Sequence, residues 1–224
     1  MSDAAPPPSS PRLVGAWVLA SGLGLATSGA IAGALAPNGG EFGLVPAPSM
    51  AEGIRNYGPR ALLAFAVWGA GLGLAQWVVL RTRIRGSGRW APLTIGGWAL
   101  TGATIGVATG ALGGGPEAYD PGALGRILAV AISVAAIGVL PATAQWIVLR
   151  RSSQPWGSYA VRFVVGLAAG GLTGWLAGTA FGLTFPSGPA WVIVGSAMGA
   201  AIGVATARPV LRSLAAAGAQ APRS

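Results

Sequence analysis

Several residue types that carry chemistry are missing from this 224-residue chain or are scarce in it. There is no cysteine and no histidine. Their absence excludes disulfides, thiol chemistry, the commonest metal and haem ligands, and Ser-His or Cys-His catalysis. Only five acidic residues occur: Asp3 near the start, and Glu41, Glu52, Glu117 and Asp120 between apolar runs. We therefore predict no catalytic residues, no metal, no cofactor and no enzymatic activity.

Charge of either sign is also scarce. Charged residues make up 8% of the chain and hydrophobic residues 53%, whereas soluble domains carry about 25% charged residues. So apolar a chain cannot cover a water-soluble surface, which predicts an integral membrane protein. The net charge of +9 comes from arginine alone. Its placement near the ends of apolar runs favours contact with membrane lipids and argues against a nucleic-acid partner.

What the sequence does contain is a series of apolar runs of roughly membrane-spanning length. There are six, at 13–35, 61–80, 90–112, 127–149, 159–183 and 190–207. They predict an all-α fold, an integral membrane six-helix bundle occupying 13–212. Residues 1–12, rich in Ala, Pro and Ser, are expected to form a disordered cytoplasmic tail, and residues 213–224 a flexible cytoplasmic C-terminus.

The arginines predict the orientation of the bundle. They cluster after the second, fourth and sixth runs, at Arg81, Arg83, Arg85, Arg89, Arg150, Arg151, Arg208 and Arg212. By the positive-inside rule, both termini are expected in the cytoplasm. The outer surface would then consist of a long first loop, 36–60, a shorter second loop, 113–126, and a tight turn at 185–189.

A motif repeats at the end of two runs. Gln-Trp-Val-Val-Leu-Arg at 76–81 and Gln-Trp-Ile-Val-Leu-Arg at 145–150 are 69 positions apart, and a weaker copy, Ala-Arg-Pro-Val-Leu-Arg at 207–212, follows 62 positions later. The spacing predicts three pseudo-repeated helical hairpins, at about 13–80, 90–149 and 159–207. The third copy has neither Gln nor Trp, so a function that needs this pair involves only the second and fourth helices.

The residue types of this motif favour anchoring and packing. Indole and guanidinium groups are favoured at membrane surfaces, and this role is expected for Trp77, Arg81, Trp146 and Arg150. Gln76 and Gln145 can bridge helices through amide hydrogen bonds. Alternatively, these two glutamines form a polar interior for a small neutral solute, with Thr101, Thr104 and Thr109 as further lining. Neither amide ionises, so such a site binds without carrying a proton.

Glycines recur every four residues in two of the runs. One ladder contains Gly102, Gly106, Gly110 and Gly114, and the other contains Gly166, Gly170, Gly174, Gly178 and Gly182. Because lipid supplies little hydrophobic drive between helices, such ladders predict close helix packing through van der Waals contact. Packing within the bundle is the first interpretation. The alternative is a ladder that docks a neighbouring subunit, or a flat lipid or pigment.

The pattern Gly-x-x-x-Gly-x-x-Gln-Trp-x-Val-Leu-Arg at 69–81 resembles the repeated element of a loosely defined group of uncharacterised bacterial multi-pass membrane proteins. The resemblance covers about half of the chain, and the second copy departs from it at Pro141 and Ala142. It implies a location in the bacterial inner membrane and brings no activity with it.

Taken together, these features predict a non-catalytic membrane protein, an accessory or structural subunit that packs against other membrane proteins or lipids, for instance within a larger energy-transducing complex. Its protein partner would be another membrane protein or a second copy of the chain. The first outer loop offers the expected contact, through Glu41, Phe42, Arg55 and Tyr57. The alternative function is a channel or facilitator for a small neutral solute.

Overall fold

The computed structural model describes residues 11–35, 49–81, 87–112, 122–150, 155–183 and 188–219. These residues form six α-helices and one short 3-10 helix, η2 (Ser87–Arg89), and no strand occurs among them. The helices are α1 (Pro11–Leu35), α2 (Met50–Leu80), α3 (Trp90–Leu112), α4 (Gly122–Leu149), α5 (Trp156–Ala180) and α6 (Gly188–Ala219). The predicted all-α fold with six helices is confirmed.

Five of the helices, α1, α2, α3, α5 and α6, are long and apolar enough to cross a membrane. In α4 the apolar stretch within the described residues is shorter, Ala135–Leu149. Large apolar side chains are exposed on the outside of the bundle, among them Leu19, Leu100, Val165 and Val204. This outward apolar surface, together with the helix lengths, is that of a multi-pass membrane protein.

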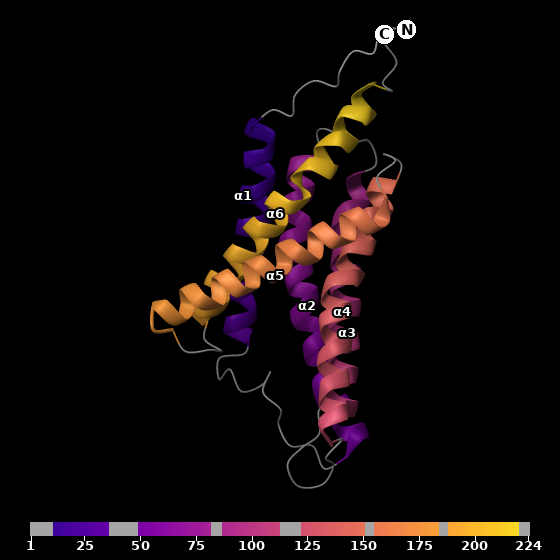
Figure 1. Ribbon diagram of the computed structural model, residues 1–224, viewed down its shortest axis with the longest axis vertical. Helices are drawn as coiled ribbons and strands as arrows, with labels where there is room; N and C mark the ends of the chain where they lie inside the picture. The colour runs from indigo at the N-terminus through magenta and orange to yellow at the C-terminus, as the bar shows by residue number, and fades with distance from the viewer. Residues whose placement is uncertain are drawn as a thin grey trace.

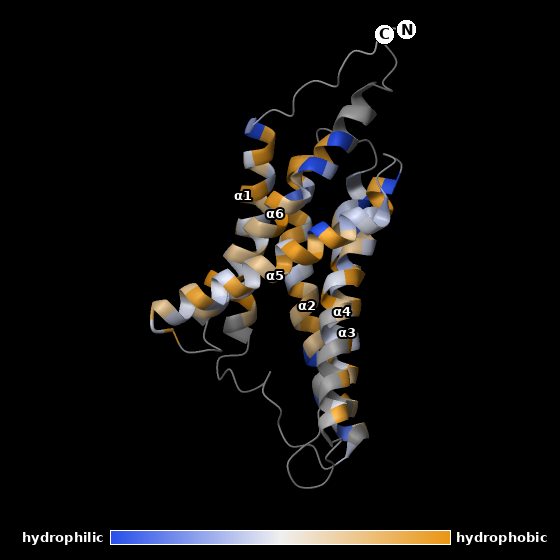
Figure 2. Cartoon of the chain, in the orientation of Figure 1, coloured by the Kyte–Doolittle hydropathy of each residue, from blue (hydrophilic) through white to orange (hydrophobic). Residues whose placement is uncertain are grey.

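The helices form a closed ring. Each helix packs against the next one along the chain, and α6 returns to pack against α1. Figure 1 shows α1 beginning and α6 ending at the same end of the bundle, with α5 crossing the other helices obliquely. Hydrophilic residues gather at that end in Figure 2, while the middle of the bundle is mostly apolar.

Aromatic side chains fill the interior of the ring. The indoles of Trp17 and Trp90 meet edge to face with centroids 5.7 Å apart. Further out along the bundle, Phe65 stacks on Trp98 at 6.0 Å, and Trp68 lies beside Trp98 at 6.3 Å. Such aromatic pairs add about 0.5 to 1.5 kcal/mol beyond the area they bury, so they help to fix how the helices face one another.

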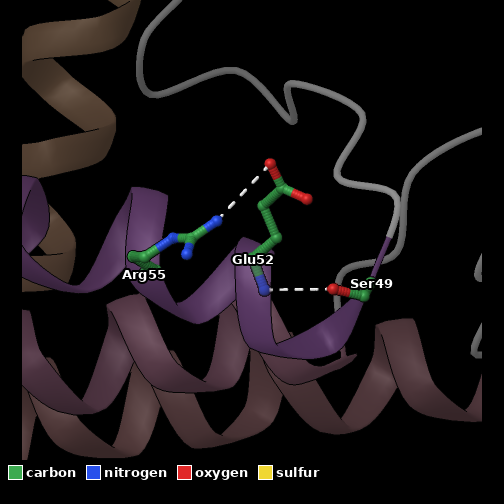
Figure 3. Close-up of polar contacts among 3 residues, drawn as sticks. All are labelled: Ser49, Glu52 and Arg55. Atoms are coloured by element: carbon green, nitrogen blue, oxygen red, sulfur yellow. Dashed lines mark hydrogen bonds and ion pairs between the residues drawn. The ribbon is translucent and has the colours of Figure 1, made fainter.

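The helix α2 begins earlier than the apolar run that predicted it. It starts at Met50 instead of residue 61, and Ser49 caps it by accepting a hydrogen bond from the backbone N–H of Glu52 at 3.3 Å, as Figure 3 shows. Its 31 residues span about 46 Å, more than the roughly 30 Å of a hydrocarbon core. The predicted first loop, 36–60, is therefore wrong over 50–60, where α2 extends beyond its apolar part.

Other helix ends differ in the same way. The helix α4 begins at Gly122 instead of residue 127, so Arg126 belongs to a helix and not to a loop. The helix α6 continues to Ala219, so residues 213–219 of the predicted flexible C-terminus are helical. An apolar run ends where polar residues begin, whereas backbone hydrogen bonding continues beyond that point and sets the real helix end.

Gly182 corrects the predicted glycine ladder of α5. It adopts a left-handed conformation, with φ of 67°. Its N–H donates to the carbonyl of Thr179 at 3.0 Å, and the N–H of Leu183 donates to the carbonyl of Gly178 at 2.9 Å. This is the Schellman geometry that ends a helix. Gly182 is exposed and closes α5 instead of packing against a neighbour.

Candidate functional site: a buried hydrogen-bonded ring

Gln76 and Gln145 lie side by side in the centre of the bundle. Both side chains are buried, Gln76 on α2 and Gln145 on α4. The Nε2 group of Gln145 donates a hydrogen bond to Oε1 of Gln76 at 3.1 Å. The two copies of the sequence motif therefore meet at their glutamines.

Each glutamine also binds the helices on either side of it. Gln76 donates through Nε2 to Ser21 Oγ on α1 at 2.9 Å, and its Oε1 accepts from Trp90 Nε1 on α3 at 3.1 Å. Gln145 Oε1 accepts from the hydroxyl of Tyr159 on α5 at 2.7 Å, and its Nε2 lies 3.5 Å from Thr94 Oγ1 on α3. The two amides thus connect five consecutive helices.

The sixth helix joins through α1. Trp17 Nε1 donates to Thr206 Oγ1 on α6 at 3.1 Å. Thr206 donates in turn to the carbonyl of Ile202 at 2.7 Å, and Ser21 Oγ donates to the carbonyl of Trp17 at 2.9 Å. We call the eight side chains of this network the polar ring. They are Trp17, Ser21, Gln76, Trp90, Thr94, Gln145, Tyr159 and Thr206.

The same arrangement of donor and acceptor recurs three times in the polar ring. Three donors on the odd-numbered helices, Trp17, Trp90 and Tyr159, each bind an acceptor on the preceding even-numbered helix, with α6 preceding α1. One helical turn after the first two donors lies a hydroxyl, of Ser21 and Thr94, near the glutamine amide of the same hairpin. One turn after Tyr159 lies Phe163, which is buried and has no hydroxyl.

Glycine contacts recur at the same sequence spacings. A Cβ added at Gly24, Gly97 or Gly166 would lie 2.5, 3.2 and 2.8 Å from the carbonyl oxygens of Gly71, Leu140 and Ala201, respectively. The residues five positions after Gly71, Leu140 and Ala201 are Gln76, Gln145 and Thr206, respectively. Five residues beyond its glycine contact α6 therefore has Thr206, one residue before the Ala207 that aligns with the glutamines in the sequence motif.

The predicted packing glycines lie mostly between helices of this chain. A Cβ at Gly166 would lie 2.8 Å from Ile202 Cα, and one at Gly174 would lie 2.6 Å from Val194 Cα. Gly170 faces α6 in the same way, Gly178 is buried, Gly102 faces Ala61 on α2, and Gly106 is buried. The surroundings of Gly110, and the whole of Gly114, lie outside the described residues. The α5 ladder is thus occupied by α6.

The motif's Trp and Arg residues lie at the edge of the bundle. The guanidinium carbon of Arg81 lies 5.7 Å from the ring centroid of Trp77, one turn before it on α2. Trp77 and Trp146 are half-buried, and Arg81 and Arg150 are exposed. A cation over an indole face gains about 0.5 to 1 kcal/mol at an exposed site.

Two of the four residues expected in a partner-binding loop, Arg55 and Tyr57, belong to α2. Glu41 and Phe42 lie outside the described residues. Arg55 is on α2, exposed, and pairs with Glu52 at 3.7 Å, as drawn in Figure 3. Tyr57 also belongs to α2, and its side chain lies outside the described part of the chain.

The threonines expected to line a solute path do not join the glutamines. Thr101 is buried and donates to the carbonyls of Gly97 at 2.9 Å and Ala136 at 3.2 Å. Thr104 donates to the carbonyl of Leu100 at 2.9 Å and borders an open, apolar groove of about 500 Å³ between α3 and α4. The side chain of Thr109 lies outside the described residues.

The sequence reasoning missed six members of the polar ring, Trp17, Ser21, Trp90, Thr94, Tyr159 and Thr206. One signal was available: Trp90 and Tyr159 are separated by the same 69 positions as Gln76 and Gln145. Within the part of the chain that the structure describes, no group of three acidic, His or Cys residues could hold a metal ion. The polar ring contains amides, hydroxyls and indoles, which bind by hydrogen bonding.

No family model, no curated protein and no solved structure matches this chain.

Proposed function

We propose that this chain is a non-catalytic integral membrane protein, an accessory or structural subunit that packs against other membrane proteins or lipids. The observation that carries the proposal is the pairing within the polar ring. The amide groups of Gln76 and Gln145 form hydrogen bonds with Ser21, Trp90 and Tyr159 and with each other. A buried polar network of this kind holds helices together and defines how they face one another.

A path for solute would need polar groups that face an open space. A carboxamide offers two N–H donors and one carbonyl acceptor with two lone pairs. Gln76 uses both lone pairs and one donor inside the bundle, and Gln145 directs its Nε2 toward both Gln76 and Thr94. The pairing favours a structural role for these side chains over solute binding.

The outer surface supports contact with lipid or with other membrane proteins. On α5, one face packs on α6 through glycines, and the opposite face exposes Leu172, Trp175 and Leu176. Exposed apolar faces of membrane helices are solvated by lipid tails or covered by partner helices. We propose that the partner, where there is one, is another membrane protein or a second copy of the chain.

The three-hairpin organisation belongs to the same proposal. The recurring Gly24, Gly97 and Gly166 contacts and the three donors of the polar ring support it, because unrelated hairpins would not place equivalent contacts at matching positions. The pseudo-repeats are then α1–α2, α3–α4 and α5–α6.

We also propose a bacterial inner membrane location with both termini in the cytoplasm. Arg12 opens α1, Arg81 and Arg150 close α2 and α4, and Arg208 and Arg212 lie near the end of α6. All five are exposed, and they lie toward the same end of the bundle, where α1 begins and α2, α4 and α6 end. The positive-inside rule supports a cytoplasmic position for that side. A reporter fused after Ser224 should read as cytoplasmic, and one inserted between Asn38 and Gly39 should read as external.

The experiment on function replaces both glutamines, Gln76→Leu with Gln145→Leu. A structural role predicts weaker assembly or lower stability, and no solute flux in liposomes with either protein. The second candidate function, a facilitator for a small neutral solute, is favoured by one observation, the burial of the paired glutamines inside the bundle. It predicts flux in the unaltered protein that the double substitution abolishes while the fold persists.

A further inference from the structure

We call the contact surface between two neighbouring helices a seam. Five seams join successive helices along the chain, and a sixth joins α6 to α1. Three of the six can be compared at equivalent glycines. In the α2–α3 seam, a Cβ added at Gly69 would lie 2.7 Å from Trp98 Cβ and 3.0 Å from Ile95 Cα. One turn later, a Cβ at Gly73 would lie 3.0 Å from Thr94 Cβ and 3.2 Å from the carbonyl oxygen of Ala91. Two successive glycines thus let the backbone of α3 approach α2 closely.

The α6–α1 seam has the same construction. A Cβ added at Gly199 would lie 2.9 Å from Gly22 Cα, and one at Gly203 would lie 2.9 Å from Val18 Cα. A side chain at either position would meet backbone atoms, which cannot move aside without displacing the helix. Close contact between backbones therefore also holds α6 against α1.

The α4–α5 seam departs from the pattern at both places. The three heavy atoms nearest to a Cβ added at Gly138 all belong to the Val164 side chain, between 2.5 and 3.7 Å away. One turn later, where α2 and α6 have glycine, α4 has Ala142, which is fully buried. At Gly138 the α4–α5 seam thus has only the isopropyl group of Val164 nearby, whereas Gly69, Gly73, Gly199 and Gly203 each have backbone atoms of the neighbouring helix within 3.2 Å.

Hydrogen bonds hold the α4–α5 seam at one end. The Tyr159 hydroxyl donates to Gln145 Oε1 at 2.7 Å, and Trp156 Nε1 donates to Thr143 Oγ1 at 3.0 Å. Trp156 and Tyr159 belong to the first turn of α5. Beyond that end, α5 crosses the bundle obliquely, as Figure 1 shows. The seam is thus fastened near the start of α5 and has no glycine-mediated backbone contact among its described residues.

We propose that the α4–α5 seam is a lateral gate in the ring, with the Tyr159–Gln145 hydrogen bond as its latch. When the latch opens, α5 separates from α4 before any other seam yields. Opening presents the Gln145 amide and the Tyr159 hydroxyl to the lipid phase. The inference does not depend on the proposed function, because it rests only on the differences between the seams.

Spin labels test the gate directly, since the chain has no native cysteine to remove. One labelled pair, Val139→Cys and Val165→Cys, places exposed probes on α4 and α5. The matched pair, Leu19→Cys and Val204→Cys, places exposed probes on α1 and α6. Distances between labels are then measured by pulsed electron paramagnetic resonance in nanodiscs, before and after removal of one buried hydrogen bond at each seam.

The expected result differs between the two seams. Tyr159→Phe removes the latch and should add a component longer by about 5 Å to the α4–α5 distances, the size of a one-turn helix displacement. Thr206→Val removes the Trp17 bond and should leave the α1–α6 distances as one narrow population. Equal broadening at both seams, or none at α4–α5, would overturn the gate.

A comparison of two disulfides leaves Tyr159 and Gln145 unchanged. It tests whether the α4–α5 seam opens first even if Tyr159→Phe does not fold. Gly138→Cys with Val164→Cys would place Cβ atoms about 3.6 Å apart, and Gly22→Cys with Ala200→Cys about 3.8 Å apart, both suited to a disulfide. Each variant is unfolded thermally in its oxidised and reduced forms. The gate predicts that oxidation raises the midpoint temperature more at 138–164, which separates first.

Loop length predicts the opposite order, because closing the longer 22–200 loop removes more entropy from the unfolded chain. A larger stabilisation by the 22–200 disulfide would therefore contradict the gate. A larger stabilisation by the 138–164 disulfide would support it against the effect of loop length.

Discussion

The helix pairs α1–α2 and α3–α4 are held together by different means from the pair α5–α6, which we call the first, second and third hairpins in line with the proposed organisation. In α1–α2 and α3–α4, a glutamine directs its amide at a hydroxyl on the partner helix, Ser21 or Thr94. In α5–α6, the matching positions hold Phe163 and Thr206, and Thr206 donates to its own helix instead. The third hairpin relies on a ladder of glycines against α6.

The amide and its hydroxyl are thus present together in α1–α2 and α3–α4 and absent together in α5–α6. A buried amide without a partner would be an unpaired polar group, which costs about 1 to 3 kcal/mol. The α5–α6 pair avoids that cost, because Phe163 has no polar group in its side chain and Thr206 bonds to Ile202. Close glycine packing then supplies the contact area that replaces the hydrogen bond.

The largest expected effect comes from filling the glycine contact of the third hairpin. Gly174→Leu places a side chain where a Cβ would already lie 2.6 Å from Val194 Cα. Overpacking of this kind costs about 1 to 3 kcal/mol, and we expect the upper end because the neighbour is backbone. Unfolding in mixed micelles measures it. Gly157→Leu on the same helix has no heavy atom within 4 Å and should change stability by less; equal losses would mean that α5 does not pack through this ladder.

A smaller effect is expected from removing a glutamine. Gln145→Leu leaves the buried Tyr159 hydroxyl without its acceptor, which should lower the free energy of unfolding by about 2 kcal/mol. Thr206→Val also leaves a buried donor, Trp17 Nε1, without its acceptor. It breaks one bond between helices where Gln145→Leu breaks three, so we expect a loss of about 1 kcal/mol, the lower end of the same range. The same micelle titration compares the two. If Thr206→Val is the more damaging change, the third hairpin depends on polar contact as much as the other two.

Rebuilding the lost contact sharpens the comparison further. Phe163→Thr with Thr206→Gln gives the third hairpin the hydroxyl and amide of the second. Each single change should destabilise the protein, and the double variant should recover about 0.6 kcal/mol relative to their sum, the average value of one such bond. A double-mutant cycle measures this coupling. Strict additivity would show that the α5–α6 backbones do not match the first two hairpins at this position.

The smallest expected effect concerns the membrane anchors. Arg81 lies over Trp77, whereas Arg212 on α6 has no tryptophan one turn before it. Arg81→Gln should therefore lower stability by about 0.5 kcal/mol more than Arg212→Gln, from loss of the cation–π contact. Unfolding in nanodiscs at matched salt measures both. Equal losses would leave interaction with lipid headgroups as the shared cause.

The sequence allowed the helices to be counted but did not define their ends. Apolar runs predicted six helices, because lipid requires about 20 apolar residues per span. The start of α2 at Met50 depends on the Ser49 cap, which lies outside the apolar run. Gly182 kept the four-residue spacing of the ladder, although its φ of 67° serves to end the helix.

The candidate site was predicted only in part. Gln76 and Gln145 stood out as a repeated motif, and their bridging role was one of the two interpretations considered. Their partners Trp90 and Tyr159 differ in residue type, so residue identity alone could not pair them, although both supply a donor at the same height. The closure of α6 onto α1 depends on tertiary packing that no local pattern encodes.

That closure joins the first helix to be synthesised with the last. Trp17 and Thr206 are 189 positions apart in the sequence, and ribosomes deliver the N-terminal helix to the membrane first. Until α6 has been inserted, Gly22 and Gly29 on α1 remain uncovered, because both face α6 in the folded protein. A chain truncated before α6 would expose this surface permanently, so the last helix completes the assembly of the first.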